Sequence, residues 1–211
     1  MEYNKLIDNT NLKPDALDSD IIALCEESKK YHFMSVCINP AFIKLAKKCL
    51  AGSDVLVCTV IGFPLGSMTT EAKVFEATDA LNKGADEVDM VINTSRLKAH
   101  DDEYVLNEIR KIKKACGDHT LKVIIETCLL TDEEKVRACQ LASKAGANFV
   151  KTSTGFSKWG AKVEDVKLMR ETVGDKLGVK ASGGVRTHEE MLAMVEAGAN
   201  RIGTSSGAKL M

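Results

Sequence analysis

Short apolar runs alternate with longer amphipathic segments along the chain. The runs are rich in β-branched residues, as is typical of buried parallel strands, and the segments between them carry apolar residues at helical spacing. We expect strands at residues 5–10, 35–39, 55–61, 87–93, 121–127, 149–153, 178–182 and 201–204. This order predicts parallel strands that are joined by right-handed helical crossovers.

The predicted helices have recognisable ends. Thr131 with Glu134, and Thr187 with Glu190, form the capping-box pattern at two helix starts. Pro40 suits the first position of a helix, where its missing N–H is not needed. The residue that follows a helix often has a left-handed backbone conformation, which glycine adopts easily. We expect Gly52, Gly84, Gly146 and Gly198 to end helices in this way. The last three of these open a repeated Gly-Ala-Asp/Asn motif that leads into a strand.

Eight strand–helix units predict a (β/α)₈ TIM barrel that occupies residues 1–211 as a single domain. An open doubly wound sheet is the alternative, because periodicity alone does not prove closure. After the last strand and its loop only residues 207–211 remain, so we expect a truncated final helix. Either the N-terminal segment or a second subunit should cover this flank, and the second option predicts a homodimer.

Composition excludes several classes of partner. The 29 basic and 30 acidic residues leave a net charge of −1, and aromatic residues make up 5%, which argues against a nucleic-acid-binding surface. No apolar run is long enough to span a membrane, and no signal peptide is visible. The seven cysteines, an odd number without C-x-x-C spacing, argue against disulfides and zinc and favour a reducing compartment. We therefore expect a cytoplasmic protein without a metal, a cofactor or a membrane partner.

Two lysines occupy neighbouring predicted strands, Lys151 in 149–153 and Lys180 in 178–182. Alternation places Val150 and Val179 toward the helices and both lysines toward the barrel interior. Since adjacent strands lie ~4.8 Å apart, the two ammonium groups could be near neighbours. Lysines that only extend to solvent are the alternative, but we favour a functional pair because lysine is uncommon in strands.

The same alternation turns Asp89 inward, where we expect it to pair mainly with Lys180. Such a pair also fits a purely structural role. Asp8 in the first strand, and Lys122 and Glu126 in the fifth, fit the inward face as well. They are either members of a functional network or a salt bridge on the barrel floor, and the pattern favours neither.

Glycine-containing loops follow the last two predicted strands. One contains Gly183 and Gly184 and leads into the helix capped at Thr187, and the other runs through residues 203–207. Loops at these places commonly bind phosphate in this fold, because glycine lets backbone N–H groups approach the anion and a helix N-terminus favours its charge. Tight turns alone would also need glycine.

Together these motifs resemble the deoxyribose-phosphate aldolases, a family of class I aldolases, over nearly the whole chain. The most specific are Lys-Thr-Ser-Thr-Gly-Phe at 151–156 and Lys-Ala-Ser-Gly-Gly-Val-Arg-Thr at 180–187. The resemblance implies that Lys151 forms the Schiff base, that Lys180 tunes its protonation and that Asp89 is the catalytic aspartate. It implies phosphate contacts at Gly155, Gly183, Gly184, Gly203, Ser205 and Ser206, and a wider network at Asp8, Cys37, Lys122 and Thr154.

The implied reaction is the reversible cleavage of 2-deoxy-D-ribose 5-phosphate to acetaldehyde and D-glyceraldehyde 3-phosphate, in deoxyribonucleoside catabolism. Asn9 stands where the family often has histidine, and the longer C-terminal tail of some members is missing. Two other functions remain open on the residues alone. One is a phosphosugar isomerase with Glu126 as its base, and the other is a non-catalytic phosphate-sensing barrel. Trapping of a covalent imine separates the aldolase from both.

Overall fold

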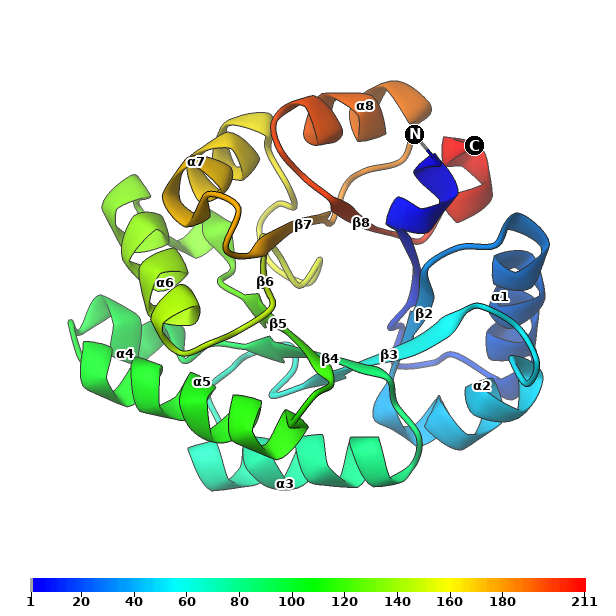
Figure 1. Cartoon of the computed structure of the whole chain (residues 1–211), viewed down its shortest axis with the longest axis horizontal. Helices are drawn as coiled ribbons and strands as arrows, with labels where there is room; N and C mark the ends of the chain where they lie inside the picture. Colours follow the sequence, from blue (N-terminus) through cyan, green and yellow to red (C-terminus); the bar gives the residue numbers. More distant parts are fainter. Residues whose placement is uncertain (1) are drawn as a thin grey trace.

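Eight parallel strands close into a barrel in the computed structural model, which describes residues 2–211 (Figure 1). Each strand pairs in parallel with the next, and β8 returns to β1, where Asp8 lies opposite Gly203. The strands are β1 Ile7–Asn11, β2 Ser35–Ile38, β3 Leu56–Ile61, β4 Glu87–Val91, β5 Thr120–Ile124, β6 Phe149–Lys151, β7 Gly178–Ser182 and β8 Arg201–Thr204. Closure confirms the predicted (β/α)₈ barrel, and the open sheet is wrong.

The helices surround this barrel (Figure 1). They are α1 Asp18–Tyr31, α2 Ile43–Cys49, α3 Thr70–Asn82, α4 Thr94–Lys98, α5 Asp102–Cys116, α6 Asp132–Lys144, α7 Val163–Val173 and α8 His188–Glu196. Short 3₁₀ helices are η1 Tyr3–Leu6, η2 Pro40–Phe42, η3 Thr127–Leu129 and η4 Gly207–Leu210. The capping boxes at the starts of α6 and α8 are confirmed. The four predicted helix-ending glycines all have positive φ angles.

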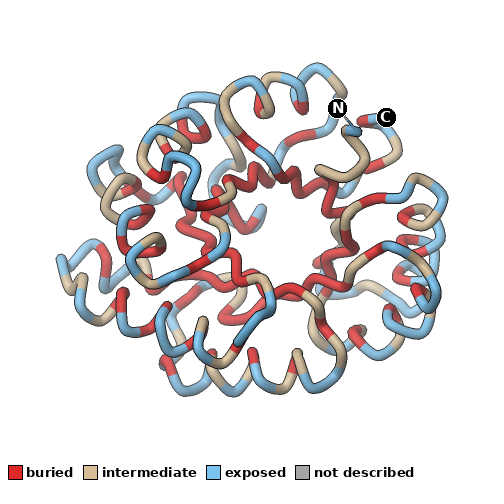
Figure 2. The backbone as a smooth tube through the Cα atoms, in the orientation of Figure 1, coloured by how far each residue is buried: buried red, intermediate tan, exposed pale blue. Residues whose placement is uncertain are grey.

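Apolar and charged side chains separate on the two faces of the strands. Val88, Met90, Val150 and Val179 point outward into the main hydrophobic core, which the helices complete. In Figure 2 the strands form a buried ring inside a shell of partly exposed helices. The inner face instead carries charged residues, as the alternation predicted, and this face holds the candidate site.

The predicted truncated final helix is the 3₁₀ helix η4, and the chain itself covers the flank beside it. The N-terminal helix η1 lies next to η4, so the two ends of the chain are neighbours (Figure 1). Tyr3 of η1 packs edge-on against His188 at a centroid distance of 5.8 Å, and a His188 ring nitrogen is hydrogen-bonded to the carbonyl of Leu210. Leu210 is fully buried. Of the two expected alternatives, the N-terminal segment covers this flank, so the reason given for a dimer at this place no longer holds.

Two further predictions concern the whole chain. No helix described in residues 2–211 is long and apolar enough to cross a bilayer. All seven cysteines are free thiols, and all but Cys49 are buried. The predicted lack of a disulfide framework is confirmed.

Candidate active site

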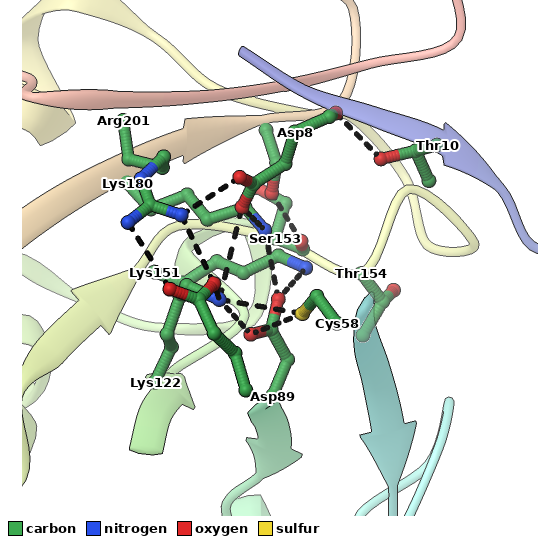
Figure 3. A network of polar contacts seen from close by, with 12 residues as sticks. Asp8, Thr10, Cys58, Asp89, Lys122, Lys151, Ser153, Thr154, Lys180 and Arg201 are labelled. Atoms are coloured by element: carbon green, nitrogen blue, oxygen red, sulfur yellow. Dashed lines mark hydrogen bonds and ion pairs between the residues drawn. The ribbon is translucent and has the colours of Figure 1, made fainter. Parts of the chain in front are cut away.

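Charged side chains from six strands meet inside the barrel (Figure 3). Residues in consecutive strands contribute, because the inward positions of parallel strands share one lumen. The members are Asp8 (β1), Glu87 and Asp89 (β4), Lys122 (β5), Lys151 (β6), Lys180 (β7) and Arg201 (β8), and all are buried. Buried charges at this density must compensate one another.

Asp89 is the hub of these contacts. Its Oδ2 accepts hydrogen bonds from the Nζ atoms of Lys151 and Lys180, each at 2.8 Å, and its Oδ1 accepts one from Lys122 Nζ at 2.8 Å. Burial alone would raise the pKa of Asp89, but the three ammonium groups hold that pKa well below its usual range. The prediction that Asp89 pairs mainly with Lys180 is wrong, because both lysines share one oxygen at equal distance.

Six of these residues form a closed ring of alternating charge, which we call the charge ring. In order around the ring they are Asp8, Arg201, Glu87, Lys122, Asp89 and Lys180. The contacts measure between 2.5 Å, from Lys180 to Asp8, and 3.0 Å, from Arg201 to Glu87. Asp8 and Lys122 are thus members of one network that extends down the barrel. Sequence reasoning missed Glu87 and Arg201, although Glu87 lies two positions before Asp89 and so shares its face.

Lys151 stands outside the charge ring and adds a positive charge to it. The ring holds three cations and three anions, so an ammonium at Lys151 leaves a surplus of one. Lys180 contacts two carboxylates, whereas Lys151 contacts only Asp89. Burial lowers the pKa of Lys180, but Asp8 and Asp89 outweigh it and raise that pKa above its ordinary value. Lys151 is therefore the one lysine of this cluster whose charge the balanced ring does not require.

Cys37 lies beside the charge ring, on β2. A hydrogen bond with Cys58 and the nearby ammonium of Lys180 lower the pKa of Cys37 to about 7, in spite of burial. The sulfurs of Cys37 and Cys58 and an oxygen of Asp89 all lie within 4.8 Å of one another, a spacing that metal ligands adopt. The surroundings do not suit a divalent cation, because Asp89 already contacts three ammonium groups and a metal would add to the positive surplus.

Glu126 lies outside the charge ring. Its backbone is left-handed, with φ 56° and ψ 66°, and its carboxylate accepts hydrogen bonds from the backbone N–H and the hydroxyl of Thr154. Of the two alternatives given for Glu126, a place in a salt bridge on the barrel floor is wrong, because its carboxylate contacts Thr154. Thr154 likewise contacts Glu126 and the N–H of Phe156 rather than the members of the charge ring.

The predicted phosphate-binding residues gather where β6, β7 and β8 end. Gly155, Gly183 and Gly184 have φ angles of 84°, 81° and 85°, which glycine adopts without strain. A Cβ on Gly183 would lie 3.5 Å from the Cα of Gly155, so these two loops touch. Thr204 donates a hydrogen bond of 2.7 Å to the carbonyl of Val185 and ties the β8 loop to the β7 loop.

This rim offers what an anion requires. Gly155, Gly184 and Ser205 are exposed, Gly183 and Ser206 are half-buried, and Gly203 is buried against Ser182 and Lys180. Helix α8 begins directly after the β7 loop and is capped by Thr187, so its N-terminus adds a partial positive charge. The barrel mouth thus combines a lysine outside the charge ring with backbone suited to a phosphate.

Comparisons with known proteins identify the family of this chain. The model of the DeoC/LacD family aldolase matches residues 4–210. A protein of Thermoanaerobacter pseudethanolicus called deoxyribose-phosphate aldolase is 62% identical over 213 residues, which cover 100% of this chain and 96% of that protein. One of Bacillus cytotoxicus with the same name is 61% identical over 212 residues, with 100% and 95% covered.

Solved structures give the same result. The structure of QR15, described as an aldolase, has a TM-score of 0.94 at 42% identity and covers 98% of this chain and 93% of that one. The deoxyribose phosphate aldolase of Aeropyrum pernix, described as a tetramer, has a TM-score of 0.89 at 36% identity, with 98% and 88% covered. Because the family model and these relatives span almost the entire barrel, this chain belongs to the DeoC/LacD family of aldolases.

Proposed function

We propose that this chain reversibly cleaves 2-deoxy-D-ribose 5-phosphate to acetaldehyde and D-glyceraldehyde 3-phosphate through a Schiff base on Lys151. The observation that carries the proposal is the position of Lys151 as the surplus cation beside a balanced charge ring. A neutral amine is the nucleophile that such a reaction needs. The names of the relatives support the substrate, and deoxyribonucleoside breakdown is the role that this substrate suggests.

The proposed reaction begins when the neutral amine of Lys151 attacks the C1 aldehyde of the sugar. Loss of water gives an iminium, which can accept an electron pair from the neighbouring carbon. When the C3 hydroxyl loses its proton, the C2–C3 bond breaks and its electrons form an enamine. D-Glyceraldehyde 3-phosphate leaves, C2 of the enamine is protonated, and water releases acetaldehyde and regenerates the amine.

Asp89 and Lys180 are the proposed proton carriers, acting through water. In the resting ring, the pKa of Asp89 is held low because three ammonium groups surround it. When Lys151 loses its proton, one of these charges disappears and the proton affinity of Asp89 rises. Deprotonation of the nucleophile would thereby prepare Asp89 to take up a proton during the chemical steps.

The phosphate is proposed to bind at the rim formed by Gly155, the β7 loop and the β8 loop. Support comes from the convergence of these loops beside the N-terminus of α8. Binding energy at this remote end would orient the C1 aldehyde toward Lys151. The phosphosugar isomerase alternative needs a carboxylate base in the lumen, and Glu126 is instead engaged by Thr154.

Reductive trapping tests the proposal directly. Acetaldehyde with borohydride should inactivate the protein and leave one ethyl group on Lys151, located by peptide mass analysis. Lys144→Leu changes an exposed lysine on α6 and should be labelled like the unchanged protein, whereas Lys151→Leu should not be labelled. An adduct found only on other lysines, or no adduct, would refute the Schiff base and leave the isomerase or the phosphate sensor.

Three further proposals concern the setting of this activity. We propose that residues 1–211 act as one catalytic domain, since the family match covers residues 4–210. The seven free cysteines support a reducing, cytoplasmic compartment. Self-association is supported by the tetramer described for the Aeropyrum pernix relative, and sedimentation of the intact protein tests it.

A further inference from the structure

A bulge interrupts the pairing of β5 with β6 directly after Lys151. The N–H of Ile125 donates to the carbonyl of Lys151 at 3.0 Å, and the N–H of Thr127 donates to the carbonyl of Thr152 at 2.9 Å. Between these two hydrogen bonds the chain advances by two residues after β5, from Ile125 to Thr127, but by only one residue after β6. The extra residue is Glu126, whose left-handed backbone is unfavourable for a residue with a Cβ. Strain of this kind commonly re-aims a side chain next to an active site.

The re-aimed carboxylate holds the loop that follows Lys151. Both oxygens of Glu126 lie 3.3 Å from the N–H of Thr154, and one also accepts a hydrogen bond from the Thr154 hydroxyl. The same hydroxyl oxygen accepts a hydrogen bond of 3.0 Å from the N–H of Phe156. Gly155 therefore lies in sequence between Thr154, which Glu126 holds directly, and Phe156, which Thr154 holds.

Glu126 makes these contacts without a counter-ion. Its exposed fraction is 4%, and no lysine, arginine or histidine nitrogen in residues 2–211 lies within 4.0 Å of its carboxylate. A buried carboxylate is costly unless N–H and O–H donors satisfy it, and here Thr154 supplies both kinds. The carboxylate is therefore committed to this loop.

We propose that Glu126 is a positioning residue for the phosphate end of the substrate, acting through Thr154 on the N–H groups around Gly155. The inference rests on the proposed function and specifies which residue shapes its phosphate site. Within residues 2–211, the hydrogen bonds of the Glu126 side chain to the segment after β6 are all made with Thr154, three positions after Lys151. Lys151 itself is held by Asp89 and by its pairing with Ile125. The loop that Glu126 holds touches Gly183, so both parts of the phosphate rim depend on its shape.

The test compares a phosphorylated substrate with its unphosphorylated form. Glu126→Ala should raise KM for 2-deoxyribose 5-phosphate by about tenfold or more, the effect expected for loss of hydrogen bonds to a charged group. Its kcat should remain within about threefold, and kcat/KM for 2-deoxyribose should change as little. Glu133→Ala removes an exposed carboxylate from α6 and serves as the matched control, with both substrates unaffected.

Thr154 variants show whether Glu126 acts through this residue. Thr154→Val removes the hydroxyl at constant shape and should raise KM for the phosphorylated sugar, whereas Thr154→Ser should restore it. In Glu126→Ala with Thr154→Val, the combined loss should be smaller than the product of the two single losses, because both changes break one contact. Glu126→Gln keeps the side-chain shape and provides a second variant if Glu126→Ala does not fold.

Three outcomes would overturn the inference: equal loss on both sugars, an unchanged KM, or multiplicative losses in the double variant. Equal loss would mean that Glu126 serves the fold or the chemistry instead. Trapping of acetaldehyde on Lys151 in the same variants keeps the two proposals apart. If labelling persists while the substrate selectivity is unchanged, the positioning role alone fails, and if the unchanged protein is not labelled, the Schiff base fails.

Discussion

Replacement of Lys180 by leucine should make activity strongly dependent on pH. The change removes one cation from the charge ring and leaves Lys122, Lys151 and Arg201 opposite three carboxylates. Balance then requires Lys151 to keep its proton. The amine that should attack the substrate becomes the ammonium that compensates the ring, so the nucleophile is lost at neutral pH.

The contacts set the size of this effect. Lys151 Nζ and Lys180 Nζ each lie 2.8 Å from the same oxygen of Asp89, so they are no farther apart than twice that distance. Two ammonium groups about 5 Å apart repel each other by roughly 3 kcal/mol at an effective dielectric constant near 20. Since about 1.4 kcal/mol corresponds to a factor of ten, removal of Lys180 should lower the neutral fraction of Lys151 by about two orders of magnitude.

The assay is kcat/KM for 2-deoxyribose 5-phosphate between pH 6 and pH 10. Lys180→Leu should be about a hundredfold impaired at pH 7, and the deficit should shrink by about tenfold per pH unit as Lys151 becomes neutral. Lys151→Leu should be inactive throughout, and Lys144→Leu should match the unchanged protein. Because leucine leaves Asp8 with fewer partners, thermal unfolding at each pH should verify that the variant is folded. A deficit that is constant from pH 6 to pH 10 would refute charge tuning and assign Lys180 to proton transfer or positioning.

Three other predictions follow from the site and the fold. Activity should be complete in excess chelator, because a divalent cation near Asp89 would face three ammonium groups, and a loss that added metal reverses would contradict this. Gly184→Asp should raise KM for the phosphorylated sugar well above that of Gly184→Asn, since the two share shape and tolerance of a φ of 85° and differ in charge; equal KM values would place the phosphate elsewhere. The pKa values of Asp8 and Asp89 are lowered in the folded protein, so both stabilise it above their unfolded pKa of about 4, and this stabilisation is lost as pH falls below it. The urea midpoint should therefore drop between pH 6 and pH 3, and Asp8→Asn should flatten that drop.

Local patterns in the sequence predict most of the fold. Alternation within short strands identifies the inward lysines and Asp89, because one face of each strand packs against the apolar helices and the other faces the barrel interior. The capping boxes at Thr131 and Thr187 fix two helix starts for reasons that lie within four residues. The predicted strands at 121–127 and 149–153 extend too far, since β5 ends at Ile124 and β6 at Lys151. The apolar and β-branched residues that follow turn away at the bulge, which periodicity does not reveal.

Contacts across the barrel lie outside the reach of local patterns. Glu87 and Arg201 are separated by more than a hundred residues, and only closure brings their side chains within 3.0 Å. The equal sharing of Asp89 by Lys151 and Lys180 depends on register between β4, β6 and β7, which no single strand determines. The left-handed backbone of Glu126 likewise cannot be predicted from its residue type, because glutamate has no preference for that conformation.

The closed charge ring limits which substitutions its members can accept during evolution. A substitution that removes only Glu87 or only Arg201 leaves the ring with unequal numbers of buried positive and negative charges, which is more damaging than the loss of the whole pair. Glu87 and Arg201 should therefore be replaced together or retained together, and their exchange for two apolar residues should be tolerated better than either single change. Among diverging homologues, these two positions should covary as a unit, and a library that randomises them one at a time would discard the viable combinations.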